Sequence, residues 1–369
     1  MINAFGAYQT YYESDLLRTH SNSAISWIGS SRAFVLLASP LFWGPILDMG
    51  YLRQIVLSGT LFIVLGEFLA SFCTQLEQLI VTQGIMVGLG NGAFFLSAVS
   101  IVPTYFPKEK QAFAMGIAAA GSSLGGVVYP IVLFQLQPKL GYGWAIRTIA
   151  LIAFITSMIP CILLRIRARP DERRAIIDLQ VLRDVKFDIW SVAWFFGNMG
   201  IFVPFFLIQQ FAVDVAGFET RHAFWTLIIM NAAATSGRIL PGKIADRIND
   251  PLRVIGVTTA ASTIVSFCWI AVRAPTPGVF FFSAMYGFCS GAFVSLSTPA
   301  TVSLAPSIEG IGTRLGMFNF IGALGLLAGN PVAGAIAESS WLGMQLFCGS
   351  VSALAFVLIC LTWWIARRH

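Results

Sequence analysis

The chain has 369 residues, of which 57% are hydrophobic and 11% are charged, and its formal net charge is +6. Soluble domains carry about 25% charged residues, so this composition cannot cover a water-facing surface and predicts an integral membrane protein. The basic residues lie in short segments between apolar runs, which argues against a nucleic-acid-binding protein. The chain has neither a phosphate-cradling loop with a lysine nor a cluster of histidines or cysteines, so we expect no enzyme, metal site or cofactor.

Eleven apolar stretches are long enough to cross a bilayer, which requires about 20 residues of helix. They cover residues 24–47, 54–73, 79–103, 111–136, 143–164, 189–212, 221–244, 254–272, 278–303, 315–336 and 344–365. The segment 1–12 before them is apolar but too short to cross. We therefore expect an all-α integral membrane fold with a truncated first helix followed by eleven full helices.

The basic residues favour one side of the predicted membrane. If 1–12 counts as helix 1, sixteen of the 23 lysines and arginines lie in the even-numbered connections or the C-terminus, and four lie in the odd-numbered connections. Such a bias marks the cytosolic side. We predict a multi-pass protein of the plasma membrane with a cytosolic C-terminus and a cytosolic linker at 165–188.

The two parts of the chain on either side of this linker resemble each other. Three matches occur in the same order at offsets of 198 to 200: 44–48 with 242–246, 92–94 with 291–293, and Gly116 and Gly125 with Gly316 and Gly325. Repeated halves are typical of transporters. We therefore divide the chain into an N-terminal helical half at 1–164, the linker, and a C-terminal six-helix half at 189–369.

The same offset aligns Met1 with about Ile201, midway along the stretch 189–212. About a dozen residues equivalent to 189–200 then have no counterpart in the first half. Half a helix cannot satisfy its backbone in lipid unless other protein covers it. We expect a gene model that starts late, with a truncated isoform or a decayed copy as the alternatives.

The loop at 44–53 (GPILDMGYLR) resembles the signature of the major facilitator superfamily. Further stretches resemble its fungal monocarboxylate-porter-like branch: 5–12 (FGAYQTYY), 26–29 (SWIG), 116–130 (GIAAAGSSLGGVVYP), 143–147 (GWAIR), 237–246 (GRILPGKIAD) and 312–317 (GTRLGM). The resemblance covers nearly the whole chain. It implies the major facilitator fold of two six-helix halves and secondary transport by alternating access.

The resemblance assigns a gating role to the loop after helix 2 and to its second copy. The residues concerned are Gly44, Asp48, Gly50 and Arg53 in the first copy, and Gly242, Asp246 and Arg247 in the second. Glycine permits close backbone approach, and a carboxylate at a helix start stabilises the positive end of the dipole. Asn249 and Asp250 replace the glycine and basic residue usual in the second copy, so we expect that copy to be the weaker one.

Arg238 is the strongest candidate for substrate binding. An ionised side chain this deep in an apolar helix is costly and indicates function, and a guanidinium matches a carboxylate through two hydrogen bonds. The resemblance supports this role, because monocarboxylate porters carry a substrate-site arginine at this place. Snorkelling of Arg238 to the headgroups is the alternative. Position 234 is alanine where those porters have a proton-coupling aspartate, and 5–12 lacks their lysine, so lactate-type proton symport is not expected.

Other polar and aromatic residues are expected to line the same pathway. Asn231 lies two turns before Arg238; Gln209 and Phe205 lie on helix 7, where Pro204 predicts a bend suited to a gate. Tyr8 and Gln9 belong to the short first helix, and together these residues favour a bulky, partly apolar anion. Arg32 either lines the cavity or snorkels outward, and Glu67 is interpreted as a packing or lipid-interface residue.

The sequence therefore predicts a secondary transporter of an organic monocarboxylate or a related amphiphilic metabolite, moved with or without a proton. An efflux transporter of a fungal secondary metabolite is the first alternative. A non-transporting or receptor-like remnant, suggested by the short first helix, is the second. The expected partners are the lipid bilayer and a small organic anion, and not nucleic acid.

Overall fold

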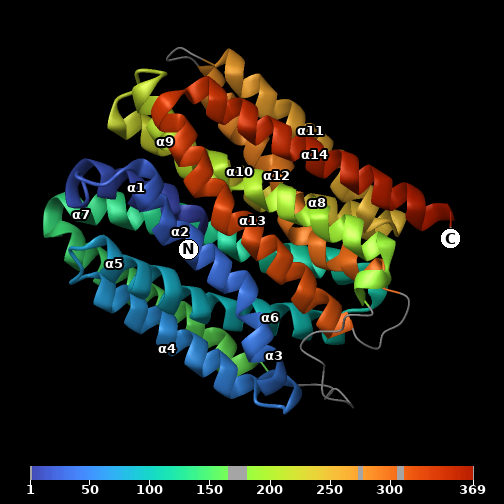
Figure 1. Ribbon diagram of the computed structural model, residues 1–369. Coiled ribbons are helices and arrows are strands. Elements are labelled where there is room, and N and C mark those ends of the chain that lie inside the picture. Colours follow the sequence, from blue (N-terminus) through green and yellow to red (C-terminus); the bar gives the residue numbers. More distant parts are fainter. Residues whose placement is uncertain (1, 165–180, 273–276, 306–310, 369) are drawn as a thin grey trace.

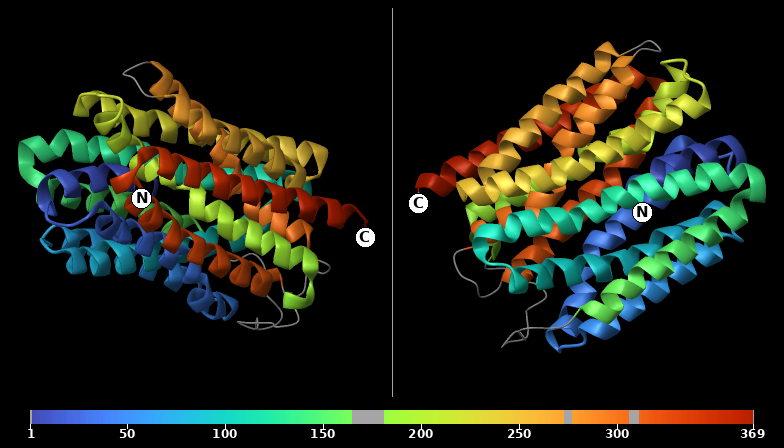
Figure 2. Two further views of the ribbon diagram at one scale, coloured as in Figure 1. Left: turned by 45° about the horizontal axis from the view of Figure 1, so that its top comes forward. Right: turned by 180° about the vertical axis from the view of Figure 1, so that it is seen from behind.

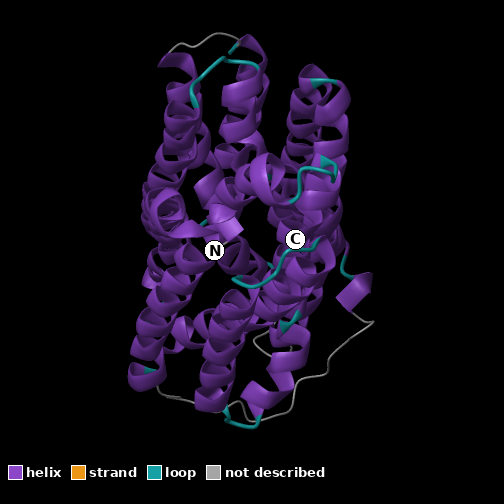
Figure 3. Ribbon diagram, turned by 90° about the vertical axis from the view of Figure 1, so that its left-hand side faces the viewer, coloured by secondary structure: helices purple, strands orange, loops and turns teal. Residues whose placement is uncertain are grey.

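A computed structural model describes residues 2–164, 181–272, 277–305 and 311–368, which fold into helices without a strand (Figure 3). The first half contains η1 (Ile2–Ala4), α1 (Phe5–Tyr11), η2 (Tyr12–Leu16), α2 (Asn22–Ala38), α3 (Pro40–Asp48), α4 (Leu52–Ala70), α5 (Leu76–Leu79), η3 (Ile80–Met86), α6 (Val87–Tyr105), η4 (Lys108–Lys110) and α7 (Gln111–Leu163). The second half contains η5 (Val181–Arg183), α8 (Val185–Ile201), α9 (Val203–Asp214), α10 (Thr220–Ile248), α11 (Pro251–Cys268), η6 (Trp269–Ala271), α12 (Pro277–Ser303), α13 (Ile311–Ser339) and α14 (Trp341–Arg368). Most of the predicted linker lies outside the described residues.

The helices run roughly parallel to one long axis and turn at its two ends (Figure 1). The joints α3–α4, α6–α7 and α10–α11 and the C-terminus of α14 share one end, called here the basic end because it carries residues such as Arg53, Lys110, Arg247 and Arg367. Gly141, at φ 79°, turns α7 back on itself at the opposite end, so α7 consists of two antiparallel limbs (Figure 2). The alternation of connections expected from the sequence is therefore present.

The outer surface of the bundle is apolar. Large side chains such as Ile162 (71% exposed) and Phe281 (68% exposed) point away from the protein. Nine stretches of the described residues have the length and hydropathy of membrane spans, against the eleven predicted. One of the nine, at Lys108–Leu163, contains both limbs of α7. The remaining difference is α10, which is long enough but contains Arg221, Arg238, Lys243, Asp246 and Arg247.

The bend predicted in helix 7 is present. α8 ends at Ile201 and α9 begins at Val203, with Pro204 in its first turn. Proline has no N–H to donate, so carbonyls of the preceding turn need other partners. The hydroxyl of Tyr286 donates to the Ile201 carbonyl at 2.9 Å, and the thiol of Cys348 lies 3.5 Å from the Gly200 carbonyl. The broken helix is therefore stabilised by neighbouring helices.

In the predicted repeat, the short helix α1 corresponds to α9. None of the described residues corresponds to α8. α1 packs directly on α9, because Gly6 lies against the carbonyl oxygens of Phe205 and Phe206. The rings of Phe5 and Phe206 lie 4.9 Å apart at this contact. α1 and α9 are therefore in direct contact, and the alignment of Met1 with about Ile201 stays a prediction.

Two pairs of helices make extensive contacts between the halves: α2 packs against α13, and the first limb of α7 packs against α10. Glycines permit the second contact. A Cβ at Gly116 would collide with the carbonyl oxygen of Arg238, and one at Gly242 would lie 2.6 Å from the Ala112 carbonyl oxygen. The glycines of α7 are not equivalent, since a Cβ at Gly121 would meet no atom within 4 Å.

This difference predicts opposite effects for two alanine substitutions on one helix. Gly116→Ala should lower stability by about 1–3 kcal/mol, because the new methyl group overpacks against the α10 backbone. Gly121→Ala should be neutral or stabilising by up to about 1 kcal/mol, because it only improves helix propensity. Thermal unfolding midpoints of the purified variants test this, and equal midpoints would contradict the close contact at Gly116.

Candidate functional site

Arg238 is buried at the contact between the two halves. Its side chain is 2% exposed, and its Nη1 donates to the Ala119 carbonyl at 2.7 Å and to the Ser122 hydroxyl, both on the first limb of α7. Its Nε has no hydrogen-bond partner within the described segments. Among the described residues, no carboxylate lies within ion-pair distance of Arg238. The geometry excludes snorkelling in this conformation and leaves a buried cation without a balancing anion.

Asn231 lies on the same helix as Arg238 and also contacts the first half. Its amide nitrogen donates to the carbonyls of Asn3 and Leu227, each at 3.1 Å. Its Oδ1 and the amide nitrogen of Asn3 are buried without partners. Two polar groups from different halves therefore keep unused hydrogen-bonding capacity beside the α7–α10 contact. Asn3 was not predicted from the sequence, although it is a polar residue within an apolar segment.

Four of the predicted lining residues surround the contact between α1 and α9. Phe205 and Tyr8 are 3% and 1% exposed. Gln9 donates to Glu13 at 2.9 Å and lies 3.4 Å from the Ser26 hydroxyl. Gln209 is buried, and its Oε1 has no partner. In this conformation these residues close the space between the halves toward the opposite end.

Arg32 does not join that group. Its Nη2 lies 3.6 Å from Oε1 of Glu67, and both side chains are 0% exposed. Arg32 therefore neither snorkels nor lies beside Arg238. The lipid-interface alternative for Glu67 is wrong, and the packing alternative stays: α4 exposes Leu57, Leu61 and Leu65, whereas Glu67 continues the buried face with Gly59 and Ile63.

The second copy of the gating loop makes the clearest contact between the halves at the basic end. Asp246 accepts hydrogen bonds from the backbone N–H groups of Ala112 (3.0 Å) and Phe113 (2.8 Å), at the start of α7. A carboxylate at a helix start satisfies otherwise unpaired N–H groups and the helix dipole. Asn249 adopts the left-handed conformation (φ 52°) that ends α10, so its replacement of glycine is tolerated. The expectation of a weaker second copy finds no support in this geometry.

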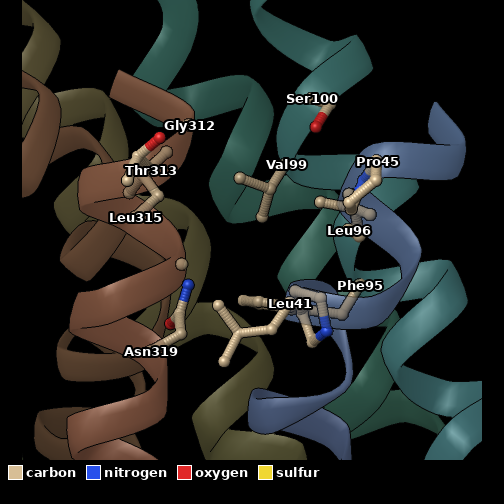
Figure 4. A pocket seen from close by; sticks show the side chains of 13 residues that line it. Leu41, Pro45, Phe95, Leu96, Val99, Ser100, Gly312, Thr313, Leu315 and Asn319 are labelled. Atoms are coloured by element: carbon tan, nitrogen blue, oxygen red, sulfur yellow. The ribbon is translucent and has the colours of Figure 1, made fainter. Parts of the chain in front are cut away.

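The first copy borders a cavity of about 50 Å³ at the basic end. Leu41, Pro45, Leu96 and Val99 lie on one side and Gly312, Thr313, Leu315 and Asn319 on the other (Figure 4). Gly44 also lines this cavity, and a Cβ there would meet no atom within 4 Å, so the expected close approach at Gly44 is absent. Gly50, by contrast, needs glycine because its φ is 89°. Arg53 and Arg247 are exposed.

At the opposite end the halves meet through polar groups. The Ser23 hydroxyl donates to the Pro331 carbonyl at 3.0 Å, and its backbone N–H donates to Glu338 at 3.3 Å. Glu13, beyond the short first helix, is half-buried nearby. Burial raises the pKa of Glu13 to about 7; the hydrogen bond from Gln9 opposes this shift, and the charges of Asp214 and Glu338 of the other half add to it. The cavity at the basic end and these contacts indicate a conformation that is closed at the opposite end.

Comparison of the chain with known proteins identifies one family and several relatives that agree with it. A sequence model of the Major Facilitator Superfamily matches residues 2–309. The chain is 39% identical to "MFS-type transporter dbaD" of Emericella nidulans, over 98% of this chain and 82% of the relative. It is 36% identical to "Aspyridones efflux protein apdF" of the same fungus, over 97% and 73% of the two chains. It is 33% identical to "Agnestins efflux protein AgnL12" of Paecilomyces divaricatus, over 97% and 82%.

Two solved structures share the fold. The human organic anion transporter MFSD10 (TETRAN) has a TM-score of 0.71 at 14% identity, with 97% of this chain and 89% of that chain covered. The Escherichia coli fucose:proton symporter FucP has a TM-score of 0.70 at 13% identity, with 98% and 95% covered. At such low sequence identity, the similarity to these two structures shows only that the fold is shared. The all-α transporter fold predicted from the sequence is confirmed, and the monocarboxylate-porter-like branch stays a prediction.

The Asp246 contact predicts a shift toward opening at the basic end when its charge is removed. Asp246→Asn should weaken the contact by about 1 kcal/mol, the usual contribution of a helix cap. Spin labels at Lys110 and Arg247, both exposed, would then show a larger fraction of molecules in which the two labels are far apart. Asp250→Asn is the control, because Asp250 caps α11 and contacts Trp363 and Arg367 within one half.

The raised pKa of Glu13 predicts pH-dependent closure of the opposite end. At low pH Glu13 is protonated in open and closed states alike, so it does not bias them. Between about pH 4.5 and about pH 7 it ionises in the open state but not in the closed state, so closure is progressively destabilised. With labels at His20 and Ser339, the open fraction should rise more with pH in the wild type than in Glu13→Gln. Asp15→Asn should behave like the wild type.

Proposed function

Because the chain belongs to the Major Facilitator Superfamily and is therefore a membrane transporter rather than an enzyme, we propose that it exports an amphiphilic organic anion by alternating access. A fungal secondary metabolite is the proposed class of cargo. The observation that carries this proposal is the buried charge of Arg238, for which the described part of the chain offers no carboxylate partner. An anionic group at the unpaired Nε would supply the missing charge and the missing hydrogen bond.

The position of Arg238 suits a substrate contact that changes during transport. Its guanidinium belongs to α10, and its present acceptors, Ala119 and Ser122, belong to the other half. Rocking of the halves would separate these partners, so binding of an anion and breaking of the contact between halves would be linked. The unpaired amide groups of Asn231 and Asn3 offer a nearby acceptor and donor for polar groups of the same molecule.

The apolar surroundings support an amphiphilic cargo. The cavity at the basic end is lined mainly by aliphatic and aromatic side chains, including Leu41, Phe95 and Leu315, with few polar groups. If the basic end faces the cytosol, as the charge bias predicts, a molecule enters from inside and leaves outside. Relatives named for the efflux of aspyridones and agnestins support this direction. Uptake of a small monocarboxylate with a proton is less well supported, because Ala234 stands where a coupling aspartate is expected.

Export by the intact fungus tests the proposal. The ratio of anionic metabolites in the medium to those in the cells, measured by mass spectrometry, should fall when the gene is deleted and recover with the wild-type chain. Arg238→Gln should reduce recovery about tenfold or more, because a hydrogen bond to a charged group contributes about 1.5–3 kcal/mol. Arg238→Lys should be intermediate, since it keeps the charge but not the planar fork.

Arg221→Gln is the matched control, because Arg221 lies on the same helix and is exposed. It should restore export like the wild type. Full export with Arg238→Gln, at an equal amount of protein in the membrane, would contradict the role of Arg238. An unchanged metabolite ratio after gene deletion would contradict the export function itself.

A further inference from the structure

A cluster of five buried or half-buried polar side chains, separate from Arg238, crosses the first half near the opposite end. It consists of Tyr12, Arg32, Glu67, Gln83 and Tyr142 and is called here the N-half cluster. Arg32 pairs with Oε1 of Glu67 at 3.6 Å, and Gln83 donates to Oε2 of Glu67 at 3.1 Å. Tyr12 donates to Gln83 at 2.8 Å and lies 2.7 Å from the Tyr142 hydroxyl.

Irregular backbone supplies two members of this cluster. Tyr12 begins η2 and Gln83 lies within η3, and both segments are π-helical. The backbone of η3 also binds Arg32: the Nε of Arg32 donates a hydrogen bond to the Gln83 carbonyl at 2.8 Å. π-Helical turns are rare and occur frequently at functional sites. A cluster whose only role was packing would not require two such departures from regular helix.

The ion pair is not fully satisfied. The Arg32 nitrogens Nη1 and Nη2 and Oε1 of Glu67 are buried without a hydrogen-bond partner. Glu67 is also the one fully buried acid in the described part of the chain. The groups that face it are Arg32 from α2, Gln83 from η3, Tyr8 from α1, Tyr12 from η2, and Tyr129 and Tyr142 from α7. Among these residues, Arg32 is the ion-pair partner of Glu67.

We propose that Glu67 is a proton-binding site and that its pairing with Arg32 couples protonation to opening of the opposite end. The proton comes from water and forms an O–H bond at Oε1, and the charge of the cluster changes from zero to +1. This inference goes beyond the export function, because it requires neither a cargo nor Arg238.

The coupling follows from the cost of an unpaired buried charge. Once Glu67 is neutral, Arg32 has lost its counter-charge, which is strongly destabilising while the site is closed. Water can relieve this cost if it reaches the guanidinium. The most exposed member of the cluster is the half-buried Tyr142, which lies next to the turn at Gly141 and 2.7 Å from the Tyr12 hydroxyl. Protonation therefore favours the conformation open at the opposite end, which is the state that would load a proton there during export.

Infrared difference spectroscopy of the full-length protein in lipid vesicles tests the protonation. Spectra taken at about pH 5 and about pH 8 should show a carboxylic acid band that disappears in Glu67→Gln and persists in Glu13→Gln. The double variant Arg32→Gln/Glu67→Gln also lacks the band and serves if the single variant does not fold. A wild-type spectrum without a Glu67-dependent band would overturn the proposal, since a purely structural ion pair stays ionised.

Spin labels at His20 and Ser339 test the coupling, in the Glu13→Gln background that removes the other pH-sensitive acid. Between about pH 8 and about pH 5, the ratio of open to closed molecules should rise by about tenfold or more. Glu67→Gln in the same background should be open at every pH, because it mimics the protonated acid. A pH response that survives in Glu67→Gln would overturn the coupling, whatever the export assay shows for Arg238.

Discussion

Lipid offers no hydrogen bonds and little stabilisation of charge, so each polar group inside this bundle must find its partner in protein. Three charged side chains are buried in the described residues: Arg32, Glu67 and Arg238. Arg32 and Glu67 balance each other within the first half. Arg238 has only a carbonyl and a hydroxyl of the other half as acceptors. The organisation of the protein around these charges follows from this constraint.

The same constraint explains the irregular helices. Pro204 breaks helix 7 at a place where Tyr286 and Cys348 accommodate the carbonyls of the preceding turn. The π-helical segments η2 and η3 place Tyr12 and Gln83 within reach of the ion pair. Irregular backbone is tolerated at membrane depth only where protein or a water-filled cavity covers it; neighbouring helices contact the break before Pro204 and the buried side of η3. They therefore coincide with the residues proposed to bind or to move.

The two ends of the bundle differ in how the halves meet. At the basic end, Asp246 binds the start of α7, and a cavity of about 50 Å³ lies between residues such as Leu41 and Val99 of the first half and Leu315 of the second. At the opposite end, Ser23, Pro331 and Glu338 join the halves, with the ionisable Glu13 beside them. One interface is therefore partly open while the other is closed, as alternating access requires. Glu13 and Glu67 are predicted to respond to pH in contrary directions at the end away from the basic end: ionisation of Glu13 favours opening there, and so does protonation of Glu67.

The sequence by itself determined the membrane class, the helix order, the alternation of connections and the repeat that relates α1 to α9. These follow from apolar length and from spacing along the chain, which are local properties. It also identified Arg238, because a charge within an apolar run is visible without coordinates. Only the tertiary structure decided the partners: that Glu67 faces Arg32 rather than lipid, that Asp246 caps α7, and that Gly44 borders a cavity while Gly116 contacts α10. Partners depend on how each helix is rotated about its axis and on which helix lies beside it, and packing between distant segments sets both.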